Sequence, residues 1–181
     1  MKQNNQGMTL IEVVAAFAIL GFLSASIFSM ILTGTKTYTR LTDTIKVQYD
    51  AQLASAKIEK QLLNCEDGIY WSQNQIATIE DNTVYAYSLD VAENVLYYGT
   101  GTVQWNGTAR VTLQKLAENV KVMKVTDEEM EYEGLDGYVK CLRLQMEMER
   151  NGKISIVDKT IFLRNKPERR MLGLIFVYPR E

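Results

Sequence analysis

A single carboxylate, Glu12, lies inside an apolar run that extends from Met8 to about Leu32. A carboxylate within a membrane segment costs roughly 2.5–3.5 kcal/mol on insertion scales, so this side chain needs a partner. In a bundle of such helices, the free amino terminus of a neighbouring chain can supply a cation. That pairing offsets two desolvation costs together and fixes the axial register between chains. Because Glu12 lies near the start of the run, its side chain can alternatively reach the lipid headgroups.

Histidine is absent from the sequence. Histidine general bases, Ser-His-Asp triads and His-ligated metal sites are therefore excluded. No nucleophile motif and no arguable acidic pair stands out either, so we expect neither an enzyme nor a bound cofactor or metal. The 20 basic and 22 acidic residues give a net charge of −2, which provides no electrostatic case for nucleic-acid binding by the whole chain.

Two cysteines, Cys65 and Cys141, are the remaining residues with distinctive chemistry. They do not form a Cys-x-x-Cys pair, so neither a zinc site nor a thioredoxin-like site is supported. A disulfide between them is chemically permitted if this part of the chain lies outside the membrane, and two unpaired thiols are the alternative.

A short polar leader, residues 1–6, carries one basic residue, Lys2, and precedes Gly7 and the apolar run. The run is long enough to span a bilayer, which takes about 20 residues. A secretory signal peptide could be cleaved near Ala25, but the apolar run continues past that point to Leu32. A plain signal anchor fits the length but explains neither Glu12 nor the break at Gly7.

The stretch Gly7-Met8-Thr9-Leu10-Ile11-Glu12-Val13 resembles the type IV prepilin signature. The resemblance implies that a prepilin peptidase cleaves after Gly7 and methylates the new amino terminus on Met8. Glu12 then becomes the fifth residue of the mature chain, the position that the family uses for assembly. Met8 replaces the commoner phenylalanine. The implied partners are the peptidase, the cytoplasmic membrane before assembly, and other pilin or pseudopilin subunits in a homo- or hetero-oligomeric filament.

The absence of proline from residues 8–64 predicts one continuous helix of about 57 residues. Its second half carries an apolar stripe at three- to four-residue spacing, which we expect a sheet to cover. The stripe consists of Leu41, Ile45, Tyr49, Leu53 and Ala56, and is continued by Ile58 and Leu62. The predicted domains are a leader at 1–7, an apolar helical half at 8–32, an amphipathic half at 33–66, a sheet domain at 67–165 and a tail at 166–181.

Beyond Gly68 the periodicity shifts towards two, which predicts strands. The most distinct pair is an antiparallel hairpin over 138–163 with a turn at Asn151-Gly152 and one buried face. Around 69–71 a short strand or an aromatic turn is expected, and near Leu116 a short helical turn that leads into a strand. Further strands are predicted at 76–80, 84–89, 95–98, 103–105 and 108–113, with turns at Asp81-Asn82 and Asn106-Gly107.

Two charged segments have ordinary interpretations. Residues 127–137 are acidic and do not match an EF-hand, so we expect a solvated loop. Residues 164–170 are basic and broken by Pro167; they could meet phosphate, but a solvated segment is favoured. Residues 172–178 are too short to span a membrane and could form a terminal strand or a patch covered by a partner subunit.

A helix with an apolar stripe, followed by an antiparallel sheet, predicts an α+β fold in which the sheet packs across the helix, as in pilins. Residues 87–98, 116–120 and the 139–163 hairpin are similar to minor pilins of the J-type pseudopilin kind. The expected function is a structural, minor subunit of a type IV pilus or related pseudopilus. The expected location is the cytoplasmic membrane, with the domain outside, and then an extracellular or periplasmic filament. Alternatives are a secretion or DNA-uptake pseudopilin, or an adhesive or DNA-binding tip subunit.

Overall fold

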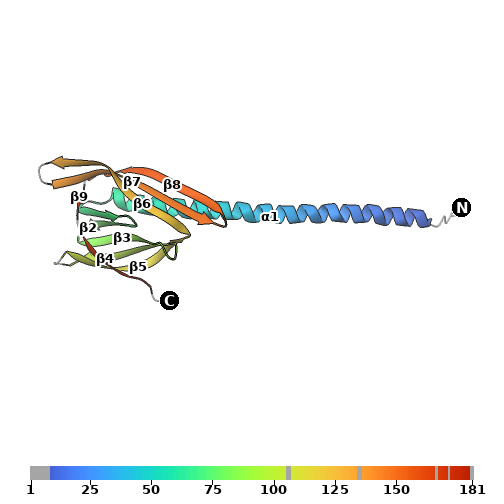
Figure 1. The fold of residues 1–181 in the computed structure, drawn as a ribbon, viewed down its shortest axis with the longest axis horizontal. Helices are drawn as coiled ribbons and strands as arrows, with labels where there is room; N and C mark the ends of the chain where they lie inside the picture. Colours follow the sequence, from blue (N-terminus) through green and yellow to red (C-terminus); the bar gives the residue numbers. More distant parts are fainter. Residues whose placement is uncertain (1–8, 105–106, 134–135, 166, 171, 180–181) are drawn as a thin grey trace, which may run out of the picture. The chain divides into compact units, whose positions relative to one another are not determined.

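The computed structural model describes residues 9–104, 107–133, 136–165, 167–170 and 172–179. Two compact units, 1–42 and 43–181, divide the chain. One helix and ten strands make up the described part (Figure 1). They are α1 Leu10–Leu63, β1 Gly68–Ser72, β2 Gln75–Glu80, β3 Thr83–Asp90, β4 Val95–Val103, β5 Thr108–Glu118, β6 Val120–Glu133, β7 Asp136–Arg150, β8 Lys153–Phe162, β9 Glu168–Arg169 and β10 Gly173–Val177.

Helix α1 runs unbroken for 54 residues, which confirms the predicted long helix. Within the first unit, its large apolar side chains are exposed; Phe22, for example, is 80% exposed. Hydroxyl groups in this apolar segment donate to carbonyls one turn earlier, from Ser24 to Leu20 at 2.8 Å and from Ser26 to Phe22 at 2.9 Å. Because each serine hydroxyl donates its proton to a backbone carbonyl, neither needs an acceptor from solvent. An apolar lipid environment requires such internal hydrogen bonding.

The sheet of the second unit is mostly antiparallel and has the order β10-β5-β4-β3-β2-β1-β9-β7-β6, with β8 paired to β7. Strands β1 to β5 form a meander in chain order, and β6 to β8 form a second meander. The two-residue strand β9 joins them, because it pairs in parallel with β1 and antiparallel with β7 at Tyr138. The architecture is therefore the expected α+β, pilin-like combination of one long helix and one large sheet.

Two of the predicted turns are present with the backbone conformation that their residues favour. Asp81 and Asn82 have φ of 45° and 67°, and Asn151 and Gly152 have φ of 50° and 73°. Positive φ at both central residues gives the type I′ turn, whose twist matches antiparallel strands. The 138–163 hairpin is confirmed as the pairing of β7 with β8. Of the predicted Asn106-Gly107 turn, Asn106 lies outside the described residues.

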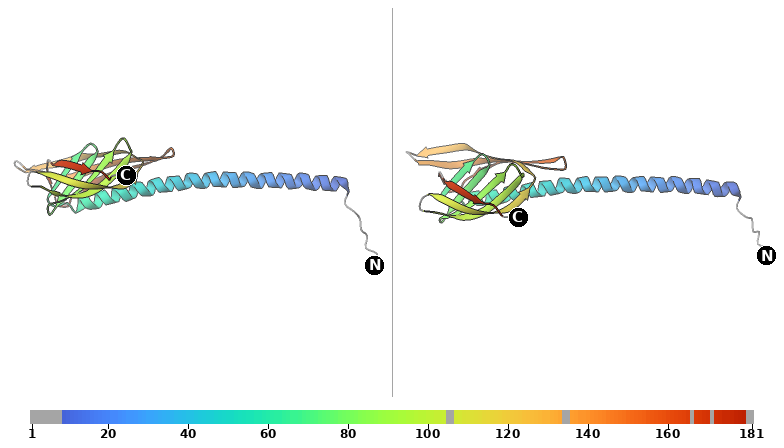
Figure 2. Two further views of the ribbon diagram at one scale, coloured as in Figure 1. Left: turned by 90° about the horizontal axis from the view of Figure 1, so that it is seen from below. Right: turned by 60° about the horizontal axis from the view of Figure 1, so that its bottom comes forward.

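Strands β1 to β5 must curl strongly, because β9 pairs with β1 at one edge of this group and β10 pairs with β5 at the other edge. In a flat sheet six strand spacings would separate β9 from β10 by about 29 Å. The four residues from Arg169 to Gly173 span at most about 14 Å. Figure 2 shows β10, in red, beside the curled strands, where it pairs in parallel with β5. In β4, a Cβ at Gly99 or Gly101 would collide with the backbone of β5, so this close approach requires glycine.

The two faces of the curled sheet carry separate hydrophobic cores. One face packs on the second half of α1 through residues such as Ile76, Tyr87 and Leu96, and this core continues into β6 to β8. The other face contains residues such as Ile79 and Val111. Leu172, Leu174 and Phe176 pack against this second core from the C-terminal segment. Of the two alternatives for residues 172–178, the structure therefore contains the terminal strand, β10.

The prediction that the sheet covers the stripe of Leu41, Ile45, Tyr49 and Leu53 is wrong. All four side chains are between 53% and 64% exposed. The buried face of α1 is instead Val47, Ala51, Ala54, Ser55, Ile58 and Leu62. Small side chains dominate the middle of this face and allow close approach, so that the Tyr87 hydroxyl donates to the Lys57 carbonyl at 3.2 Å. Only Ile58 and Leu62 of the predicted set are on the buried side.

Two local predictions are also wrong. Leu116 lies in strand β5 rather than in a helical turn, because its neighbours Lys115 and Ala117 pair with β4 across a bulge. The acidic segment 127–137 is not a loop. Its described backbone continues β6 and β7, which pair as far as Glu133 and Asp136. Backbone pairing between strands does not depend on side-chain polarity, so an acidic composition does not exclude a strand.

The β7–β8 hairpin has one buried face, as expected, but β8 contributes less to it than its isoleucines suggest. Leu142, Leu144, Met146 and Met148 of β7 are at most 1% exposed. From β8, Val157 and Ile161 join them in the core. Ile154, Ile156 and Phe162, in contrast, are 58%, 70% and 70% exposed.

Candidate assembly site

The Glu12 carboxylate caps the N-terminus of its own helix. Its Oε2 accepts hydrogen bonds from the Thr9 backbone N–H at 2.8 Å and from the Thr9 hydroxyl at 2.9 Å. The Glu12 backbone N–H points back to the Thr9 hydroxyl oxygen at 3.4 Å. This reciprocal arrangement is a capping box, in which Thr9 is the N-cap and Glu12 the third helical residue. In a single chain the carboxylate is therefore already hydrogen-bonded, but no cation of the described residues faces it.

Gly7 and Met8, the predicted cleavage and methylation positions, lie outside the described residues. Among the described residues, α1 is the one helix long and apolar enough to cross a membrane. Leu10 and Ile11, which lie between Thr9 and Glu12 in the capping box, are 83% and 77% exposed. The carboxylate thus sits at the start of an apolar surface that other parts of the described chain leave open.

The part of α1 that belongs to the sheet domain makes polar contacts with the β7–β8 turn and with β8. At the β7–β8 turn, Asn151 donates to Asp43 at 2.9 Å, and Arg150 lies 3.7 Å from the same carboxylate. Further along, Lys159 pairs with Glu59 at 3.0 Å. These are exposed pairs that contribute little energy individually, and they lie beside the buried core that holds this part of the helix against the sheet.

Cys65 and Cys141 are both free thiols in this structure, and both are buried. The Cys65 sulfur faces the Gly68 carbonyl at 3.1 Å and the Ile79 carbonyl at 3.9 Å. Burial raises the pKa of the Cys65 thiol from 9.0 to about 11. The bridge that the sequence permits is not formed here, and the two thiols act as small buried side chains of the sheet domain.

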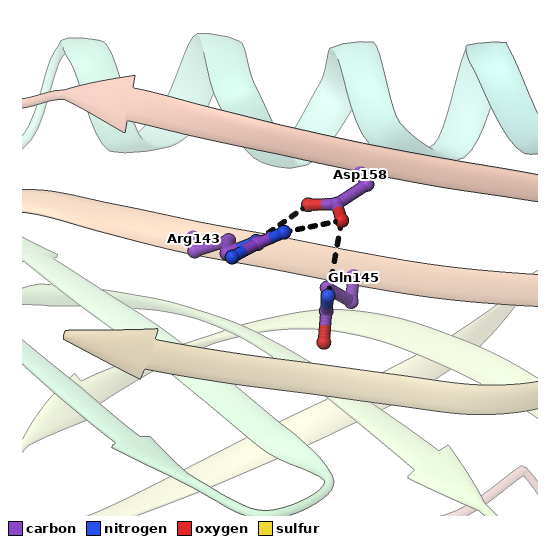
Figure 3. A network of polar contacts seen from close by, with 3 residues as sticks. All are labelled: Arg143, Gln145 and Asp158. Atoms are coloured by element: carbon purple, nitrogen blue, oxygen red, sulfur yellow. Dashed lines mark hydrogen bonds and ion pairs between the residues drawn. The ribbon is translucent and has the colours of Figure 1, made fainter. Parts of the chain in front are cut away.

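A polar network covers part of the outer face of the β7–β8 hairpin (Figure 3). Arg143 donates from Nε and Nη2 to the two carboxylate oxygens of Asp158, each at 2.8 Å. Gln145 donates to the same carboxylate at 3.0 Å. Hydrogen bonds from Arg143, and then from Gln145, lower the pKa of Asp158 from 3.8 to about 2. The network consists of cross-strand neighbours and fixes strand register rather than forming a pocket.

Two arginines of the C-terminal segment, Arg169 and Arg170, make contacts within the domain. The Arg169 guanidinium lies over the Trp71 ring, 4.4 Å from its centroid. Arg170 lies 3.7 Å from Glu168. Nearby, Asn165 donates to the Cys65 carbonyl at 3.4 Å. The Arg169–Trp71 contact attaches β9 to β1. Both arginines are less available for phosphate than they would be in a solvated tail.

The N-terminal region matches the family model of the prokaryotic N-terminal methylation motif over residues 2–34. This motif is the type IV pilin and pseudopilin signature, and it contains Gly7, Met8 and Glu12. Neither a curated protein nor a solved structure gives a significant match to the chain. The motif, which includes the apolar first part of α1, supports a type IV pilin or pseudopilin. Proteins of this class are anchored in a membrane by their N-terminal helix before they enter a surface filament.

The capping role of Thr9 was not predicted, although its signal is in the sequence. A Ser or Thr followed three residues later by Glu, just before an apolar run, is the signature of a capping box. In Thr9-Leu10-Ile11-Glu12 that pattern overlaps the prepilin signature. Among the described residues, no group of three or more His, Cys, Asp or Glu side chains is placed to hold a metal ion.

Proposed function

We propose that this chain is a structural, minor subunit of a type IV pilus or a related pseudopilus. A prepilin peptidase removes residues 1–7 and methylates the amino group of Met8. The subunit waits in the cytoplasmic membrane with its N-terminus inside and residues 43–181 outside, and is then extracted into a filament. The observation that carries this proposal is the methylation motif over residues 2–34, which contains the apolar first part of a 54-residue helix whose later part packs on a sheet.

In the filament, the Glu12 carboxylate pairs with the amino terminus of Met8 on an adjacent chain. The capping box supports this role because Thr9 holds the carboxylate at the end of the helix, next to the position that cleavage would create. Exchanging hydrogen bonds with Thr9 for an ion pair replaces one satisfied state by another, so the carboxylate is never left unpaired in the apolar environment.

Intact-mass and amino-terminal analysis of the protein from its native host tests processing, and variants of Glu12 test assembly. We expect a chain that begins at methylated Met8. Glu12→Ala and Glu12→Leu should insert into the membrane normally and be depleted from sheared filaments, whereas Glu66→Ala, a change of an exposed glutamate on the same chain, should be neutral. Retention of residues 1–7 beside an active peptidase, or normal incorporation of both Glu12 variants, would contradict the proposal.

A pseudopilin of a type II secretion or DNA-uptake system would share the motif, the helix and the sheet, so these assays do not separate it from a pilin. Loss of secretion or of transformation on deletion of the chain, together with co-purification of sister minor subunits, distinguishes these systems. A DNA-binding tip subunit is less well supported, since Arg169 and Arg170 contact Trp71 and Glu168 of the domain itself.

A further inference from the structure

Strand β10 is the last strand at one end of the sheet and, among the described strands, pairs with β5 alone. Its Gly173 N–H donates to the Gly107 carbonyl of β5 at 3.3 Å. Backbone groups of successive residues point to opposite sides of a strand, so those of the next residue face away from β5. The N–H and C=O groups of Leu174 and Phe176 therefore lie on the outer side of β10. We call these backbone groups the open edge.

Strand β10 lacks the features that protect the other edge strands of this domain. Natural edge strands are commonly protected by charged side chains or by bulges. Strand β6 has register shifts against β7 and carries exposed Lys121 and Lys124. Strand β8 carries exposed Lys153 and Lys159, and Lys159 pairs with Glu59 of α1. The sequence of β10, Gly-Leu-Ile-Phe-Val, has no charge and pairs with β5 without a register shift. Of these edge strands, β10 is therefore the one best suited to accept another strand.

Apolar side chains lie on both faces of β10. Leu174 and Phe176 pack against the core on the face opposite α1. Ile175 points to the other face, where it is 55% exposed and lies beside the exposed Arg110 of β5. Backbone donors and acceptors at two-residue spacing are matched by an extended strand. Such a strand, added to the open edge, would extend the core on one face and cover Ile175 on the other.

We propose that the open edge pairs antiparallel with the open edge of a second copy of this chain. The two outward-facing residues lie symmetrically about Ile175. A twofold axis at that position pairs Leu174 of each copy with Phe176 of the other, so that every group of both open edges is hydrogen-bonded. The two Ile175 side chains then contact each other across the axis. The pairing does not depend on the proposed function, and a chain that retained its leader would leave it unaffected.

The charges of the domain favour this symmetric arrangement. The Arg110 side chains of the two copies would be separated by three strand spacings, or about 14 Å. This distance exceeds the Debye length of about 8 Å at physiological ionic strength, so their repulsion is screened. Pairing of β10 with β6 or β8 of a second copy would instead place the lysines of those strands beside an apolar strand. An interface of five residues a side is smaller than the roughly 1,000 Å² of a stable complex, so the pair is transient and is best detected covalently.

Disulfide trapping of the full-length chain in detergent tests the pairing. In the variant Ile175→Cys, the twofold axis places the two introduced thiols on a non-hydrogen-bonded pair. Its Cα atoms are about 4.5 Å apart, within the range that a disulfide allows. With copper phenanthroline as the oxidant, we expect a covalent dimer whose linked peptides both contain position 175. The matched control is Ile156→Cys, at a 70% exposed position of β8, which should cross-link about tenfold more slowly or less.

Equal cross-linking rates at positions 175 and 156 would overturn the proposal. The same variant in cells of the native host tests the identity of the partner. An adduct there that joins position 175 only to a different protein would show that the open edge accepts a foreign strand, and the second copy would be the wrong occupant.

Proline at position 174 tests the backbone contribution. Because the Leu174 N–H faces away from β5, proline removes this donor without removing a bond to β5. In the Ile175→Cys background, Leu174→Pro should slow dimer formation by about tenfold relative to Leu174→Ala, which loses the side chain but keeps the N–H. Tryptophan fluorescence during a urea titration checks that both variants are folded. Equal rates from two folded variants would contradict pairing through the open edge, and if the proline variant is unfolded, the comparison of positions 175 and 156 decides alone.

Discussion

At the scale of single residues, three polar or reactive side chains, Glu12, Asp158 and Cys65, form hydrogen bonds within the fold. Glu12 and Thr9 satisfy each other at the start of α1. Asp158 is held by Arg143 and Gln145 on the surface of the β7–β8 hairpin. Cys65 is buried where α1 meets β1. In each case the side chain forms its hydrogen bonds with a neighbouring group of the fold.

The reactivity of Cys65 follows from its burial. Because desolvation raises the pKa of its thiol to about 11, the thiolate is scarce in the folded chain at pH 8. We expect iodoacetamide to leave Cys65 unmodified in the folded chain at pH 8 and to modify it rapidly in urea. The raised pKa also means that the folded state loses stability relative to the unfolded state as the pH rises from about 9 to about 11.

Mass spectrometry of labelled peptides measures this protection. Cys141, which is 3% exposed, serves as the internal comparison and should be protected as well. Rapid modification of Cys65 before unfolding would show that the thiol is accessible, and a disulfide-linked peptide pair would show that the bridge forms in the protein from its host.

At the scale of elements, two different things decide the position of α1. The sequence of α1 determines that the segment is helical, whereas packing against the sheet determines which face of the helix is buried. The buried face has Ala51, Ala54 and Ser55 in its middle, whereas the larger side chains of Ile45, Tyr49 and Leu53 are exposed on the other side of the helix.

A substitution on each face of α1 should therefore have a different effect on the domain. Ile58→Ala removes a fully buried side chain and should lower the free energy of unfolding by about 2–5 kcal/mol. Ile45→Ala removes an exposed one and should change it by less than about 1 kcal/mol. Urea unfolding of the full-length chain in detergent, followed by tryptophan fluorescence, measures both. Equal losses would contradict the assignment of the two faces.

The sequence predicted the elements whose signals are local. Strict alternation over Leu142, Leu144, Met146 and Met148 predicted β7, and Asn151-Gly152 predicted its turn. The helix, its length and the positions Gly7, Met8 and Glu12 of the candidate site followed from composition and from the prepilin signature.

What the sequence did not predict depends on partners distant in the chain. The extended conformation at Leu116 depends on pairing of its neighbours with β4, and Asn119, with φ of 63°, redirects the chain from β5 into β6. Strand β9 has two residues and no pattern of its own. The choice between the two apolar faces of α1 also depends on the sheet, because periodicity alone gives both faces the same weight.

At the scale of the whole domain, the C-terminal segment completes two separate structures. Glu168 and Arg169 form the strand that joins β1 to β7. Leu172, Leu174 and Phe176 cover the core on the face of the curled sheet opposite α1. The sequence favoured a solvated segment for residues 164–170 and left a terminal strand or a covered patch open for residues 172–178. Described residues of both segments instead pair with, or pack against, the sheet.

Neighbouring residues of β10 provide a matched test of this role. Phe176 packs against the second core, whereas Ile175 is 55% exposed. We expect Phe176→Ala to lower the free energy of unfolding by about 1–3 kcal/mol, since it removes a partly buried aromatic side chain. Ile175→Ala should have less than half of that effect. The same urea titration of the full-length chain decides between them, and similar losses would mean that β10 does not cover the core.

The position of β9 also sets the order in which the domain can fold. Asn165 and Cys65, whose contact lies beside the β1–β9 pair, are 100 residues apart in sequence. Closing a loop of that size is entropically costly and slow compared with forming the hairpins β2–β3 and β7–β8. During synthesis both meanders can pair before residues 168–177 leave the ribosome, but the strand that joins them into one sheet is missing until then. If a ribosome stalled before this point, the nascent chain would contain two partial sheets with unpaired edge strands. Chaperones and proteases would bind these exposed edges.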